Sequence, residues 1–135
     1  MTEDEALARF GLAPKPQDIP AVRELLASQI IAAEDEEDDS GLMKLCCIQL
    51  FSNGDVSDSM LIWAAKQSSF DNGINIDVQL VCGAGLDKTI DYLRTLSSED
   101  AAEAMRYIEE CKMSGDFERF PTGEVLNYYR DYYRL

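Results

Sequence analysis

The sequence of 135 residues contains no histidine. This absence excludes Ser-His-Asp and Cys-His nucleophile systems, histidine general bases and most catalytic zinc sites. The four cysteines form no Cys-x-x-Cys pair, which excludes zinc-ribbon and thioredoxin-like sites. No phosphate-binding glycine loop is present, because Gly83-Ala84-Gly85 lacks the further glycines or the lysine of such loops. We therefore expect neither a cofactor nor a bound metal.

Long apolar runs are also missing from the chain. No stretch approaches the roughly 18 apolar residues that a membrane span needs. The N-terminus, MTEDEALARF, is acidic and lacks the apolar segment of a secretory signal. The cysteines, Cys46, Cys47, Cys82 and Cys111, lie in apolar stretches, where a free thiol behaves as a small hydrophobic residue. These observations predict reduced, buried cysteines in a cytoplasmic protein.

Basic residues are scarce, with 12 lysines and arginines against 26 acidic residues and a net charge of -14. Such a chain is repelled by phosphate backbones and by anionic lipid. We expect no binding to nucleic acid or membranes, and a basic protein is the partner that the charge permits. Acidic charge also keeps many proteins dispersed without any partner. Six consecutive acids, residues 34–39, are expected to form a solvated linker.

The apolar residues that are present recur at helical spacing along most of the chain. Ile19, Val22, Leu26 and Ile30, for example, mark one face of a helix that begins near Gln17. Glycine and proline signals separate this segment from later ones. We predict a single all-α domain, with an N-terminal helical segment and acidic linker over residues 1–39 and a core of helical hairpins over residues 40–135.

Several helix boundaries follow from local signals. Ser40 is the expected cap of one helix, and the apolar helix that carries Leu61, Ile62, Trp63, Ala64 and Ala65 is expected to be central. That helix is expected to stop at SSFDNG, residues 68–73, where Asp71-Asn72-Gly73 signals a turn. Residues 74–82, which include INIDVQLV, are predicted to be helical, with a strand as the alternative because the pattern alternates at first.

The chain contains a weak internal repeat with a period of about 30 residues, in which helices end at glycine and new helices soon begin. The repeat predicts three hairpins, over residues 41–69, 75–96 and 98–134. The recurring residues are Gln49, Gln79 and Glu109, followed by Gly54, Gly85 and Gly115.

This pattern resembles small HEAT-like helical repeats over residues 41–134. The resemblance implies a short α-solenoid used as a binding scaffold, and it brings no catalytic residues with it. An irregular helical bundle with an added N-terminal helix is the alternative architecture.

In a solenoid, the second helices of successive hairpins line one continuous face. That rule gives a predicted binding face of aromatic and charged residues, although Trp63 and the C-terminal helix also suit a plain core. Tyr129 and Tyr133 share a face with Leu126 and are expected to point inward. The predicted binding residues are Trp63, Lys66, Asp87, Asp91, Arg94, Tyr128, Arg130 and Tyr132.

Together these features predict a non-enzymatic protein-binding module or scaffold. One form is an inhibitor or immunity-type protein that neutralises a basic toxin or nuclease, since acidic charge speeds association with such a partner. The alternative is a carboxylate-based, divalent-metal-dependent enzyme, and a third class is a structural part of a larger assembly. The sequence does not define an oligomeric state.

Overall fold

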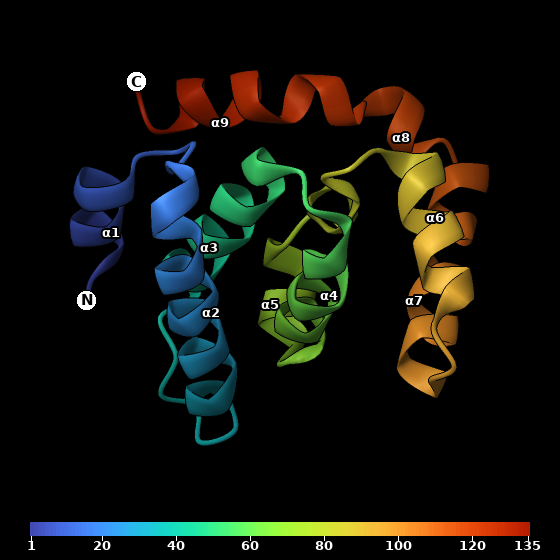
Figure 1. The fold of residues 1–135 in the computed structure, drawn as a ribbon, viewed down its shortest axis with the longest axis horizontal. Coiled ribbons are helices and arrows are strands. Elements are labelled where there is room, and N and C mark those ends of the chain that lie inside the picture. Colours follow the sequence, from blue (N-terminus) through green and yellow to red (C-terminus); the bar gives the residue numbers. More distant parts are fainter.

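The computed structural model describes all 135 residues and contains only helices and their connections (Figure 1). The all-α prediction is confirmed, and the helices pack into one helical bundle. The α-helices are α1 (Glu3–Phe10), α2 (Ile19–Ala33), α3 (Ser40–Asn53), α4 (Ser59–Gln67), α5 (Phe70–Asn75), α6 (Leu86–Thr95), α7 (Glu99–Met113), α8 (Asp116–Arg119) and α9 (Val125–Tyr132). Short 3-10 turns precede four of the helices, namely η1 (Pro16–Asp18), η2 (Val56–Asp58), η3 (Val78–Cys82) and η4 (Thr122–Glu124). No helix combines the length and the apolar composition of a membrane span.

Three helical hairpins are present, but their helices pair differently from the prediction. The helices in closest contact are α2 with α3, α4 with α5, and α6 with α7. These pairs stand side by side, while α9 runs across one end of them from the α6–α7 pair toward α1 (Figure 1). The predicted hairpins over 41–69, 75–96 and 98–134 are therefore displaced by one helix, and the second helices do not form one continuous face. A glycine that ends a helix does not determine which neighbour the next helix packs against.

The most buried helix is α3, not α4 as the apolar composition of residues 59–67 suggests. Residues 42–51 of α3 are buried except for a half-exposed Lys44. In contrast, α4 exposes Ala64 and Gln67. Helix α3 contacts α1, α2, α5 and η3, so apolar side chains are needed all around it.

Local capping explains two further differences from the sequence prediction. Asp39, rather than Ser40, caps α3, because its carboxylate accepts a hydrogen bond of 3.1 Å from the Leu42 amide. The expected turn at residues 68–73 is instead the start of α5, because the Ser69 hydroxyl accepts from the Asn72 amide at 3.0 Å. The prediction that a helix ends at Gly54 is confirmed, with a φ of 71° at this glycine, and Ser98 caps α7 by accepting a hydrogen bond from the Ala101 amide.

Two of the three recurring polar residues have matching structural roles. Gln49 donates a hydrogen bond of 2.8 Å to the carbonyl oxygen of Gly11, and Gln79 donates one of 3.1 Å to that of Asp116. Each buried amide thus fastens a crossing segment to the hairpin stack. Glu109, in contrast, is half exposed on α7, so the third member of the repeat is not equivalent.

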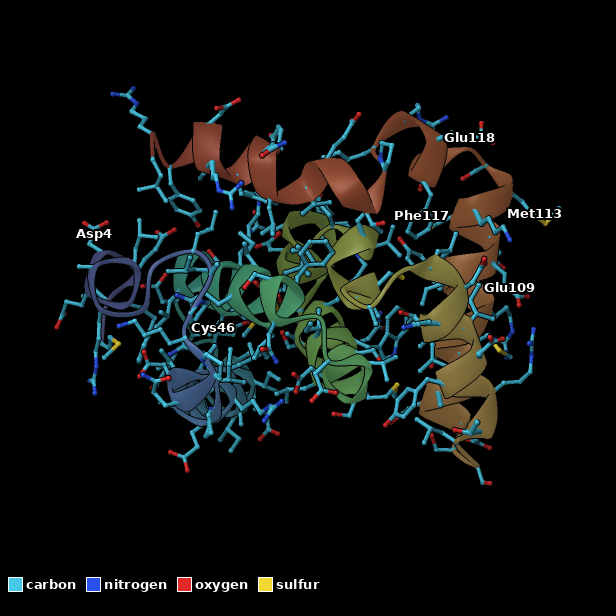
Figure 2. All side chains as sticks on the ribbon, turned by 45° about the horizontal axis from the view of Figure 1, so that its top comes forward. Asp4, Cys46, Glu109, Met113, Phe117 and Glu118 are labelled. Atoms are coloured by element: carbon cyan, nitrogen blue, oxygen red, sulfur yellow. The ribbon has the colours of Figure 1, made fainter.

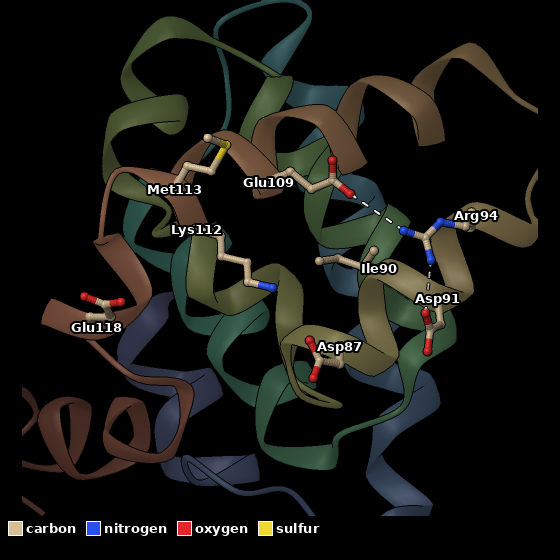
Figure 3. A pocket seen from close by; sticks show the side chains of 8 residues that line it. All are labelled: Asp87, Ile90, Asp91, Arg94, Glu109, Lys112, Met113 and Glu118. Atoms are coloured by element: carbon tan, nitrogen blue, oxygen red, sulfur yellow. Dashed lines mark hydrogen bonds and ion pairs between the residues drawn. The ribbon is translucent and has the colours of Figure 1, made fainter.

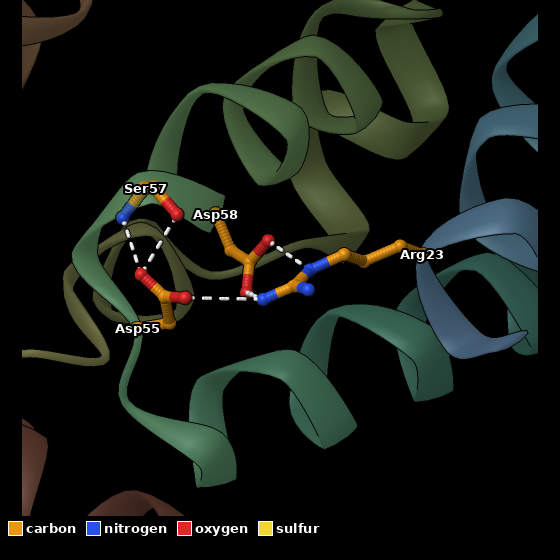
Figure 4. A network of polar contacts seen from close by, with 4 residues as sticks. All are labelled: Arg23, Asp55, Ser57 and Asp58. Atoms are coloured by element: carbon orange, nitrogen blue, oxygen red, sulfur yellow. Dashed lines mark hydrogen bonds and ion pairs between the residues drawn. The ribbon is translucent and has the colours of Figure 1, made fainter. Parts of the chain in front are cut away.

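A polar network fixes the first hairpin to the second (Figure 4). Arg23 on α2 donates to both carboxylate oxygens of Asp58, at 2.7 and 3.0 Å, and to Asp55 at 3.1 Å. The Ser57 amide and hydroxyl donate to Asp55, and these bonds, with Arg23, hold the pKa of Asp55 below its usual value. The network therefore fixes the position of the residues that lead into α4.

Candidate functional site

An open groove of about 710 Å³ lies where α6 and α7 meet α8 (Figure 3). We call it the acidic groove. Three of the predicted binding residues, Asp87, Asp91 and Arg94, come together in it from one face of α6. Their spacing of three to four residues brings them to the same side of the helix. The full lining is Asp87, Ile90, Asp91, Arg94, Glu109, Lys112, Met113 and Glu118.

The charges of the acidic groove are unbalanced, with four carboxylates against two cations. Arg94 lies 3.3 Å from Asp91 and 3.9 Å from Glu109. All three side chains are largely exposed, so these ion pairs hold little energy and exchange readily with other partners. Asp87 and Glu118 take part in no ion pair within this chain. The groove thus offers acidic groups to an incoming cation.

Apolar surface lies within the same groove. Ile90 is 7% exposed and forms part of the core beneath it, whereas Met113 is 89% exposed at the end of α7. Figure 2 shows Met113 projecting outward, near Glu109 and Glu118. A methionine side chain is flexible and polarisable, so it adapts to different partner surfaces. The groove therefore combines carboxylates with an adaptable apolar contact.

The predicted residues of α4 are structural. Trp63 is 3% exposed and its ring lies 5.6 Å from that of Tyr107, which confirms the core interpretation of this tryptophan. Lys66 is 5% exposed, and its ammonium donates to the carbonyl oxygens of Gly73 and Ile76, both at 2.5 Å. Burial lowers the pKa of Lys66, and the nearby Asp77 carboxylate opposes that shift. Lys66 thus fastens α4 to the C-terminal end of α5.

The predicted residues of α9 lie apart from the acidic groove. Tyr128 and Tyr132 are exposed, at 53% and 59%, as predicted from their helix positions. Arg130 is also exposed and donates a hydrogen bond of 3.1 Å to Asn127 on its own helix. Because α9 crosses the ends of the hairpins, these three side chains do not extend the face of α6.

The inward-facing tyrosines of α9 are where the sequence places them. Tyr129 is 1% exposed and its hydroxyl donates to Asp77, while the half-buried Tyr133 donates to Glu3 at 3.0 Å. Burial is the main cause that raises the pKa of both phenols, and the neighbouring carboxylates add to it. These contacts attach α9 to η3 and to α1.

The sequence did not indicate several residues of the surface hollows. Lys112 and Met113 follow an apolar stripe and carry no pattern of their own, while Glu109 was visible only as a weak repeat position. Phe70 lay in an expected turn and Ile74 in a segment predicted as helix or strand, yet they are 82% and 69% exposed on α5. An exposed aromatic residue cannot be told from a buried one when its helix is not recognised.

The acidic run at residues 34–39 forms the predicted linker between α2 and α3. Asp38 accepts a hydrogen bond of 3.0 Å from Asn72, and Asp39 caps α3. Elsewhere in the chain, no three cysteine or acidic side chains converge in a way that would hold a metal ion. Comparison with known proteins finds no matching family model, no matching curated protein and no matching solved structure.

Proposed function

We propose that this protein is a non-enzymatic protein-binding module whose partner is basic, and that the acidic groove is its contact surface. The observation that carries the proposal is the groove itself, in which four carboxylates face two cations. Its acids add to a net charge of -14. Charge of this kind attracts a basic partner and accelerates association with it.

The rigid placement of the groove supports the same function. All its side chains except Glu118 come from α6 and α7, which form one hairpin and bury Ile90, Leu93 and Ile108 against the rest of the core. Side chains on such a scaffold lose little freedom when a partner binds. The stacked hairpins would then act as a short HEAT-like scaffold, with the groove at its end.

The proposal extends to a partner class and a location. An inhibitor or immunity-type protein that covers a basic enzyme fits a groove in which four carboxylates face two cations. The four buried, unpaired cysteines support a reducing compartment such as the cytoplasm. The alternative of a carboxylate-based enzyme gains no specific support, since the groove is open and two of its carboxylates contact Arg94.

Selection from a displayed library of random linear peptides tests the proposal. The immobilised protein would be the target at low ionic strength, and the double variant Asp87→Asn/Asp91→Asn would be the counter-target. We expect the enriched peptides to be rich in lysine and arginine and to bind wild type at least about tenfold more tightly than the variant. Their affinity should fall as salt is added.

Arg130, which is exposed on α9 outside the groove, provides a matched control. The variant Arg130→Gln changes charge without touching the groove, so it should leave affinity within about twofold. Enrichment of peptides without net positive charge, or equal binding by the Asp87→Asn/Asp91→Asn variant, would contradict the proposed site.

A further inference from the structure

A second groove lies on the opposite side of α7 from the acidic groove. It consists of three adjoining hollows of about 370, 440 and 360 Å³. The first and second share Lys66, Ile74 and Tyr107, and the second and third share Asp77 and Phe120. The hollows therefore form one elongated path from α5 to α9, which we call the α5–α9 groove.

One end of the α5–α9 groove is apolar and strongly exposed. Phe70 and Ile74, one turn apart on α5, are 82% and 69% exposed, and the Tyr107 ring across the hollow is 38% exposed. Contiguous exposed apolar side chains of this size mark interaction surfaces in monomeric proteins. Aromatic residues beside a hollow are also the side chains that most often dominate binding energy.

The middle of the groove is polar and nearly neutral. Lys66 and Arg119 face Asp77 and Asp116 there. Arg119 is paired with Asp116, whereas the ammonium of Lys66 uses two of its three N–H groups on carbonyl oxygens of its own chain. Balanced donors and acceptors suit the amide groups of a peptide main chain, which carry both kinds of group without net charge.

The other end of the groove is aromatic again. Phe120 and Tyr128 pack edge to face with their ring centroids 5.3 Å apart, and Tyr128 is 53% exposed. Lys44 lies 5.1 Å from the centre of the Tyr129 ring in the same hollow. This end therefore also offers apolar surface, bordered by a cation that has no carboxylate partner in the chain.

We propose that the α5–α9 groove binds an extended peptide segment of a partner, with one large apolar side chain at each end and polar residues between them. The apolar side chains occupy the Phe70–Ile74–Tyr107 hollow and the Phe120–Tyr128 hollow. The main chain between them lies along the balanced charges of Lys66, Arg119, Asp77 and Asp116. The occupant differs from that of the acidic groove, which is unbalanced by two negative charges.

The test uses a displayed library of random linear peptides, selected on the immobilised protein at high salt. Salt screens attraction to the acidic groove but not apolar burial, so failure of the proposed function does not affect this selection. Enriched peptides would be synthesised and their affinities measured by calorimetry. Their position would be mapped by amide chemical-shift changes on the isotope-labelled protein.

We expect peptides that share two large apolar positions at a constant separation and that shift amides of α5, η3 and α9. Phe70→Ser and Tyr128→Ser should each lower affinity at least about tenfold, as expected when a buried interface anchor is lost. Ile31→Ser is the matched control, because Ile31 is 65% exposed on α2, away from the groove. It should change affinity less than about twofold.

Several results would overturn the proposal. They are the absence of any enriched sequence, peptides that lack the two apolar positions, and binding that Phe70→Ser leaves unchanged. A bound peptide that is helical, or self-association of the protein that Phe70→Ser abolishes, would assign the groove to a different occupant and would equally reject an extended segment.

Discussion

Arg23 on α2 and Asp58 at the start of α4 form a two-pronged ion pair, with Nε–Oδ1 at 2.7 Å and Nη2–Oδ2 at 3.0 Å (Figure 4). The Asp58 side chain is 6% exposed and that of Arg23 is 36% exposed. Paired geometry and a buried carboxylate make this contact stronger than the exposed ion pairs of the same chain.

The first prediction concerns this ion pair. Asp58→Asn should lower the free energy of unfolding by about 1–3 kcal/mol, because a buried carboxylate is lost and the guanidinium keeps only its weaker contact with Asp55. Chemical denaturation measures the change. Asp91→Asn is the control, since the Arg94–Asp91 pair is exposed, and it should shift stability by less than about 0.5 kcal/mol. Equal losses in both variants would contradict this ranking.

The second prediction separates the tyrosines of α9 by burial. Tyr129→Phe should cost about 1–2 kcal/mol, because Asp77 loses the hydroxyl donor, and Tyr129→Ala about 3–5 kcal/mol. Tyr128→Ala removes a ring that is 53% exposed and should cost less than about 1 kcal/mol. Thermal and denaturant unfolding of the three variants test this order. Comparable losses for Tyr128→Ala and Tyr129→Ala would show that α9 is seated differently.

The third prediction concerns the thiols and alkaline pH. Burial raises the pKa of Cys46, which lies within α3 (Figure 2), from its ordinary value of 9.0 to about 12. The folded state holds the proton more tightly than the unfolded state. The contribution of the Cys46 thiol to the free energy of unfolding is therefore complete below pH 9 and is lost as pH rises through about 12. One such group contributes a slope of at most about 1.4 kcal/mol per pH unit.

Cys46→Ala isolates this effect from the phenols, whose raised pKa values act in the same direction. The variant should be less stable at neutral pH, but its stability should fall less steeply than that of wild type between pH 9 and 12. In the native protein, all four thiols should resist a thiol reagent at pH 8, and all four should react after unfolding. Parallel pH profiles for the two proteins would contradict the assignment to Cys46.

The fourth prediction concerns a close approach of two backbones. A Cβ atom at Gly83 would lie 2.8 Å from the carbonyl oxygen of Phe51 and 3.0 Å from its Cα. Gly83→Ala should therefore force η3 away from the end of α3 and cost about 1–3 kcal/mol. Gly123→Ala meets no atom within 4 Å and should be neutral within about 0.5 kcal/mol in the same unfolding experiment. An unchanged free energy of unfolding for Gly83→Ala would contradict the close approach of the Gly83 and Phe51 backbones.

The sequence predicted the helices better than it predicted how they pack. The periodic apolar face correctly placed Val22 and Leu26 inward on α2, and the offset of Tyr128 from Tyr129 correctly separated an exposed ring from a buried one. Both results depend only on geometry within one helix. Pairing between helices depends instead on long-range contacts, and the bonds from Gln49 and Gln79 to distant carbonyls leave no local pattern.

The candidate site was predictable only in part for the same reason. Asp87, Asp91 and Arg94 share one face of one helix, so spacing alone brought them together. Glu109 and Glu118 join them only because α7 and α8 fold back beside α6. Lys66 reads as an exposed cation in the sequence, and its burial follows from carbonyl groups that are freed at the C-terminal end of α5.

The most direct test of the proposed function is a charge swap between the acidic groove and a basic peptide selected on the protein. Asp87→Lys should lower the affinity for that peptide at least about tenfold. Replacing the lysine or arginine of the peptide that contacts position 87 by glutamate should restore much of the lost affinity. Titration calorimetry on the four combinations measures the coupling between the two positions. A groove that binds basic partners predicts restoration by the swapped pair. Additive losses, with the doubly swapped pair binding worst of all, would contradict it.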